Sequence, residues 1–191
     1  LRFMLDREVV PLYALAFAVL CFMTLKTHLL VRPHVLTWPI IVLWAAGLLR
    51  ASETTRRPSI WLAFLLVLWV NLHGGFVLAF PLLGLIGLDA ISKAPREQQR
   101  TLLRGWSLFA VISLLATLVN PFGYKAWLFI VDLMDNSYLK HVSEWQAVSF
   151  AEYGSIEIWL YSLLALGLLG MLRLPVWRTL LLLCLLYEAL S

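Results

Sequence analysis

Apolar positions run longest between residues 59 and 88, where thirty consecutive residues carry no charged side chain. As one helix at 1.5 Å per residue this run would measure roughly 45 Å, whereas the hydrocarbon core of a bilayer is about 30 Å thick. Two adjacent glycines near its centre, and Pro81 beyond them, are unfavourable inside one long helix. The pattern therefore predicts a helical hairpin, residues 59–72 and 76–88, with its turn at His73-Gly74-Gly75.

Further apolar segments bounded by charged residues recur along the chain. They predict an all-α protein, a polytopic bundle of about seven transmembrane helices in a single membrane domain, residues 1–191. Several segments are shorter than the 17–25 residues typical of a span, so we expect buried ends or snorkelling flanks. The candidate spans are residues 9–25, 35–49, 60–72, 76–88, 105–119, 156–172 and 177–190.

Composition supports a membrane protein. The chain is 62% hydrophobic and only 14% charged, and its mean hydropathy is +0.86, which excludes an ordinary soluble domain. Nine tryptophans and six tyrosines suit many interfacial anchors. Because the chain opens on Leu1 and ends within an apolar stretch, we expect a fragment of a longer protein. Cys21 and Cys184 lie inside apolar segments, where a structural disulfide is not expected.

The basic residues predict the orientation. With a turn at His73-Gly74-Gly75, eleven lysines and arginines fall on one side of the membrane and four on the other. If residues 59–88 were one span, the division would be seven against eight. By the positive-inside rule the richer side is cytoplasmic, so the pattern predicts a multi-pass protein of the bacterial inner membrane. The net charge of +4 then reflects the excess of basic residues on the cytoplasmic side, and we expect no nucleic-acid partner.

This orientation gathers the candidate functional residues on the outer side. Arg32 precedes Pro33 and His34 at the start of a span, where a guanidinium could bind a phosphate in bidentate fashion or simply reach lipid headgroups. Asn71 and His73 flank the predicted turn. They could contact a ligand, or they could only cap the helix and satisfy backbone carbonyls.

Two further outer segments carry polar residues. Asn120-Pro121-Phe122-Gly123 is typical of a helix end. Residues 124–140, which follow it, predict an amphipathic helix along the membrane surface, either an anchor or one wall of a groove for a lipid tail.

Beyond that helix, Glu144 is the outer carboxylate best suited to acid–base chemistry or to sugar hydroxyls, and Trp145 could stack on a sugar face. Glu152 and Glu157 are weaker candidates, and we expect Glu188, inside the last span, to face the protein interior. The four histidines lack metal-binding spacing, so we expect no metal and no cofactor.

Four motifs together resemble a group of bacterial multi-spanning membrane proteins related to the C-type glycosyltransferases. The resemblance covers roughly residues 30–150 and implies sugar transfer from a polyprenyl-phosphate donor to an acceptor outside the cytoplasm. Such enzymes usually place an essential acidic residue in a first outer loop, which residues 1–191 do not contain, so the catalytic base is left unassigned. The motifs are Arg32-Pro33-His34, residues 69–76, Asn120-Pro121-Phe122-Gly123 and Ser143-Glu144-Trp145-Gln146.

Under this hypothesis the partners are a lipid-linked sugar donor and membrane lipids. The catalytic candidates are Glu144 and His73, and the substrate-binding candidates are Arg32, His34, Asn71, His73, Asn120, Trp145 and Gln146. Two alternatives remain. A transporter or flippase could use the broken hairpin to line a substrate path, although no second broken segment suggests an inverted repeat. A non-enzymatic subunit of a polysaccharide-assembly system is the other.

Overall fold

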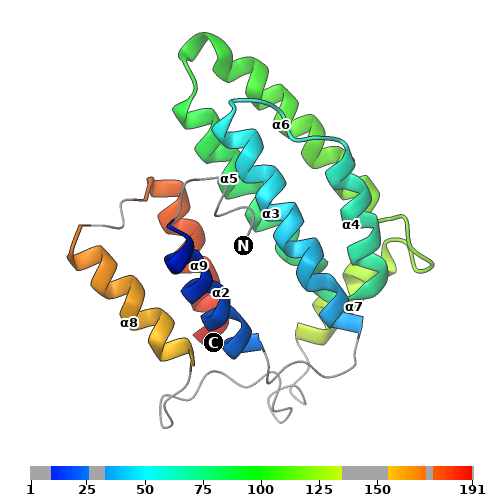
Figure 1. Cartoon of the computed structure of the whole chain (residues 1–191). Coiled ribbons are helices and arrows are strands. Elements are labelled where there is room, and N and C mark those ends of the chain that lie inside the picture. The colour runs from blue at the N-terminus through cyan, green and yellow to red at the C-terminus, as the bar shows by residue number, and fades with distance from the viewer. Residues whose placement is uncertain (1–9, 26–32, 135–154, 171–173, 191) are drawn as a thin grey trace. The chain divides into compact units, whose positions relative to one another are not determined.

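The computed structural model describes residues 10–25, 33–134, 155–170 and 174–190. These residues form helices and connecting turns and contain no strand (Figure 1), which confirms the all-α prediction for this part of the chain. The contacts gather into two compact units, Leu1–Val35 with Val148–Arg173 and Leu36–Ala147 with Leu174–Ser191. The single membrane domain stays a prediction.

The first unit pairs two apolar helices, α2 (Pro11–Leu25) and α8 (Ser155–Leu168). The rings of Phe17 and Trp159 meet edge to face, with centroids 4.4 Å apart. The Trp159 indole N–H donates to Thr24 Oγ1 at 3.2 Å, which satisfies its one donor inside an apolar pair. Pro11 opens α2, where its missing N–H costs nothing.

The second unit is built around four helices, α3 (Thr37–Glu53), α4 (Trp61–Leu72), α5 (Ala79–Lys93) and α6 (Arg96–Ala116). Each of α3 and α6 packs against both α4 and α5, so the four helices enclose one core. α9 (Val176–Leu190) packs on the outside of α5. The largest fully buried side chains are apolar and come from α3, α4, α5 and the segment between α4 and α5: Trp44, Leu48, Leu66, Trp69, Phe76 and Ile86.

The directions of these helices follow from two hydrogen bonds. Ser52 and Asp89 meet near the C-terminal ends of α3 and α5, so these two helices run parallel. Asn71, near the end of α4, bonds to Val119 just beyond α6, so α4 and α6 also run parallel. A short turn joins α3 to α4, so α4 runs antiparallel to α3. Since α5 runs parallel to α3, the chain reverses between α4 and α5, at His73-Gly74-Gly75, as predicted (Figure 1).

The reversals give the second unit two chemically different ends. We call one the basic end, residues 50–60, 89–104 and 174–179, and the other the turn end, residues 70–78 and 117–130. The basic end carries eight basic and three acidic side chains, namely Arg50, Arg56, Arg57, Lys93, Arg96, Arg100, Arg104 and Arg178 against Glu53, Asp89 and Glu97. The loops predicted to share a side therefore do share one end of this unit.

Each candidate span overlaps a helix, but length limits what these helices can do. The stretch Gly74–Lys93, formed by the 3-10 helix η3 (Gly74–Leu78) and α5, is long and apolar enough to cross a membrane, and no other helix in the described ranges is. Shorter apolar helices run over Pro11–Thr24, Trp61–Leu72, Glu157–Leu168 and Val176–Tyr187. The seven-span arrangement stays a prediction.

The predicted amphipathic helix begins where expected, as α7 (Lys125–Met134), and its expected remainder, residues 135–140, lies outside the described residues. The Trp127 ring lies 5.1 Å from those of Phe76 and Phe80, and its N–H donates to Thr117 Oγ1 at 2.9 Å. At Trp127 and Ile130 the apolar stripe therefore packs on the bundle, and the roles of this helix as a membrane anchor or as one wall of a lipid-tail groove stay predictions.

Candidate functional site

The turn at the end of α4 is held by the ring of His73. This residue is extended, with φ −161° and ψ 144°, and its Nδ1 accepts the Gly75 N–H at 2.9 Å. The ring therefore caps the turn by accepting from a backbone amide, and its contact with a ligand stays a prediction. Since Nδ1 is an acceptor, the neutral imidazole carries its proton on Nε2.

Asn71 joins two helix ends. Its Nδ2 donates to Val67 O and to Val119 O, both at 2.8 Å. The first bond closes a turn of α4, whereas the second ties α4 to the segment that follows α6. The residue is nevertheless exposed. Asn71 therefore braces the turn end and still presents polar atoms to its surroundings.

Asn120 shapes the loop between α6 and α7. Its Nδ2 donates to Thr117 O at 2.7 Å and to Gly123 O at 3.2 Å, and its Oδ1 accepts the Phe122 N–H at 2.8 Å. Gly123 sits at φ 56°, a left-handed conformation that favours glycine. These bonds are those of an Asx turn, so the described contacts of Asn120 are structural, and its role in substrate binding stays a prediction.

A groove of about 540 Å³ lies beside this turn, and we call it the turn groove. Three polar residues line it, namely Asn71, His73 and Lys125. Its apolar lining includes Phe76, Phe122, Phe129 and Ile130. Among the residues that the structure describes, no carboxylate pairs with the Lys125 ammonium. The groove thus combines one cationic group and two neutral polar side chains with an aromatic surface.

The glycines of the turn allow α7 to approach. A Cβ at Gly74 would lie 2.5 Å from Ile130 Cδ1, closer than carbon atoms pack. The structure places a side chain of α7 in this space, and this contact fixes one wall of the turn groove.

Replacing Gly74 by alanine should therefore lower the stability of the protein only modestly, by about 1 kcal/mol, because the clashing atom is the end of the Ile130 side chain and can move to another rotamer. Ile130→Val removes the clashing methyl, so the double variant should be no less stable than Gly74→Ala alone. Thermal unfolding of the purified full-length protein in detergent measures both. Strictly additive losses from the two substitutions would contradict this packing.

The structure brings only part of the predicted site together. Asn71 and His73 share the turn groove, and Asn120 holds the neighbouring loop. His34 falls in the 3-10 helix η2 (Pro33–Leu36), but its side chain lies outside the described part. The other predicted residues, Arg32, Glu144, Trp145 and Gln146, also lie outside the described residues, so their approach to His73 stays a prediction.

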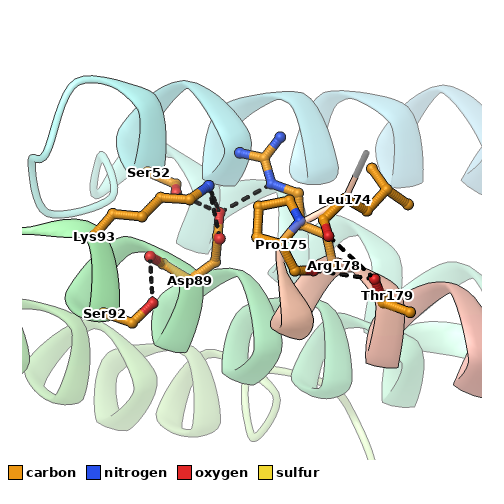
Figure 2. A network of polar contacts seen from close by, with 8 residues as sticks. All are labelled: Ser52, Asp89, Ser92, Lys93, Leu174, Pro175, Arg178 and Thr179. Carbon is orange, nitrogen blue, oxygen red and sulfur yellow. Dashed lines mark hydrogen bonds and ion pairs between the residues drawn. The ribbon is translucent and has the colours of Figure 1, made fainter. Parts of the chain in front are cut away.

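Sequence reasoning missed a buried charge cluster at the basic end (Figure 2). Asp89, whose side chain is fully buried, accepts from Arg178 Nε at 2.9 Å and from Ser52 Oγ at 3.3 Å. Lys93 Nζ lies 2.7 Å from its Oδ1 and 2.8 Å from its Oδ2. The cluster joins α3, α5 and α9, and its contacts are those of a structural clamp.

No three His, Cys, Asp or Glu residues within the described ranges lie close enough together to hold a metal ion. Comparisons with protein-family models, curated proteins and solved structures find no match to this chain. The resemblance to C-type glycosyltransferases therefore stays a hypothesis that rests on the four motifs.

Proposed function

We propose that the chain is part of a membrane glycosyltransferase that uses a polyprenyl-phosphate sugar donor, and that the turn groove binds this donor. The observation that carries the proposal is the joint lining of one groove by Lys125, Asn71 and His73 together with three phenylalanines. A polyprenyl-phosphate sugar has three chemically distinct parts, an apolar tail, an anionic phosphate and a polar sugar. The groove offers a complementary group for each.

Individual residues of the turn groove suit the separate parts of the donor. Phe122 and Phe129, which are exposed, supply apolar surface for the first isoprene units, and the remaining tail would lie in lipid. Lys125 supplies a positive charge for the phosphate. The Nε2–H of His73 is suited to phosphate or sugar oxygens, and the Oδ1 of Asn71, whose Nδ2 already donates to two carbonyls, is suited to a sugar hydroxyl. A volume of about 540 Å³ is in the range of small-molecule sites.

The charge distribution supports an extracytoplasmic position for this groove. The basic end lies at the opposite end of the second unit, and the positive-inside rule assigns such an end to the cytoplasm. Multi-pass insertion in a bacterial inner membrane is part of the proposal. So are the roles inferred from the sequence alone, in which Arg32 is a second phosphate ligand and Glu144 the acid–base candidate.

The proposal predicts that Lys125→Gln weakens use of the donor by about tenfold to a hundredfold, because one charge-assisted contact to phosphate is lost. The effect should fall mainly on the KM for the donor, and Lys125→Arg should recover most of it. The assay is sugar transfer from a polyprenyl-phosphate donor by the full-length protein in liposomes.

Arg100→Gln is the matched control, because Arg100 is an exposed cation at the opposite end of the second unit and does not line the turn groove. It should leave the KM unchanged. Equal donor dependence in Lys125→Gln and wild type, at equal expression, would remove Lys125 from the proposed site.

A further inference from the structure

The basic end contains a second groove, of about 950 Å³, between the turn that precedes α4 and the part of α6 from Glu97 to Ile112. We call it the arginine groove, because Arg56 and Arg57 line it. Polar groups are concentrated in the turn and the start of α6, where Glu97 is the carboxylate in its lining. Trp61, Leu108, Phe109 and Ile112 give it apolar surface.

The backbone of the turn is fixed in a way that presents the two arginines. Thr55 adopts a left-handed conformation with φ 49°, which is uncommon for a β-branched residue. The Arg56 N–H donates to Ala51 O at 2.9 Å, and the Trp106 indole N–H donates to Arg56 O at 3.2 Å. These bonds hold the Arg56 backbone, while both arginine side chains are exposed.

A close helix contact reinforces this position. A Cβ at Gly105 would lie 3.0 Å from the Cβ of Arg57, so glycine lets α6 pack directly under the arginine pair. In the described part of the chain neither arginine has a carboxylate partner. Two guanidinium groups therefore stand side by side in sequence on a fixed turn, with their charge available to an anion.

The arginine groove continues into an apolar groove of about 300 Å³ along the contact between α4 and α6. The two grooves share Ile60 and Ile112. From there the second groove follows Ala63, Val67 and Leu115 toward the turn end. We call this continuation the seam.

We propose that the arginine groove and the seam together bind one anionic phospholipid, with its phosphate at Arg56 and Arg57 and an acyl chain along the seam. Along this surface a cationic end is followed by a narrow apolar path, which matches the order of the anionic phosphate and the acyl chain in the lipid. Trp61, which is 71% exposed beside the arginines, suits the headgroup level. Basic pockets between helices on the cytoplasmic side are known to favour anionic headgroups. This inference rests on the membrane insertion and orientation proposed above, and it does not depend on the proposed enzymatic activity.

The test is native mass spectrometry of the full-length protein in detergent, titrated with phosphatidylglycerol or phosphatidylcholine of the same chain length. We expect at least tenfold tighter binding of phosphatidylglycerol. Arg56→Gln with Arg57→Gln should remove this preference. Arg100→Gln with Arg104→Gln changes the charge equally on exposed residues that do not line the groove, so this control pair should keep it.

Two competitors separate a lipid site from a site for free anions. Glycerophosphoglycerol, which has the headgroup but no acyl chains, and inorganic phosphate should both fail to displace phosphatidylglycerol. Displacement by either compound, equal binding of the two lipids by wild type, or equal losses in the two variant pairs would each overturn the proposal. The thermal midpoint of every variant, which should match wild type, excludes loss of binding through misfolding.

Discussion

Replacing Lys93 and Arg178 together by methionine should destabilise the protein by about 3–5 kcal/mol, because the fully buried carboxylate of Asp89 would lose both cations. Each single substitution should cost much less. The cation that is left in place still lies within 3 Å of the carboxylate, and one charge suffices to prevent an uncompensated buried anion. The losses should therefore be strongly non-additive, which a double-mutant cycle measures directly.

A third substitution makes this test specific to charge. Adding Asp89→Asn to the double variant removes the buried anion while keeping the shape of the side chain, so it should recover most of the lost stability. Chemical or thermal unfolding of the full-length protein in detergent is the measurement. Additive single losses, or no recovery on adding Asp89→Asn, would show that Asp89 is not held by these two charges.

Gly87→Ala should destabilise the bundle by about 1–3 kcal/mol, whereas Gly84→Ala, on the same helix, should be neutral or stabilise it by up to about 1 kcal/mol. A Cβ at Gly87 would lie 2.8 Å from Trp106 Cε3. The Trp106 ring is held by its bond to Arg56 O, so it cannot move without cost. At Gly84 a Cβ would meet nothing within 4 Å.

Gly84→Ala is the control for Gly87→Ala, because both glycines lie in α5 and different surroundings face them. Unfolding midpoints of the two alanine variants, measured in the same detergent, give the sign directly. Equal effects of the two substitutions would mean that α5 does not present Gly87 to Trp106.

The helices could be predicted from the sequence where apolar segments end at charged residues or glycines. The turn at His73-Gly74-Gly75 was predictable because a thirty-residue uncharged run is too long for one span and contains two adjacent glycines. The start of α6 was not. The helix begins at Arg96, nine residues before the apolar segment, because a helix can extend beyond its apolar part when its first turns are solvated.

The candidate site was predictable only in part, since sequence spacing shows which residues share an end but not which side chains meet. Asn71 and His73 were identified because polar residues beside glycines stand out in an apolar run. Lys125 lines the same groove because Trp127 and Ile130 pack one face of α7 on the bundle. The amphipathic pattern does not show whether this face packs on protein or on lipid. Asp89 closed an apolar run, and nothing in the sequence paired it with Arg178, 89 positions away.

The central claim is that the turn groove binds a polyprenyl-phosphate sugar, and photo-crosslinking tests it most directly. A photoreactive analogue of the donor would be added to the full-length protein in liposomes and its adducts mapped by peptide mass spectrometry. The account predicts adducts concentrated at residues 122–130 and 73–76, displaced by unlabelled donor but not by polyprenol without phosphate, and reduced in Lys125→Gln. Adducts spread over the exposed apolar side chains of α4 and α6, unaffected by unlabelled donor, would contradict it.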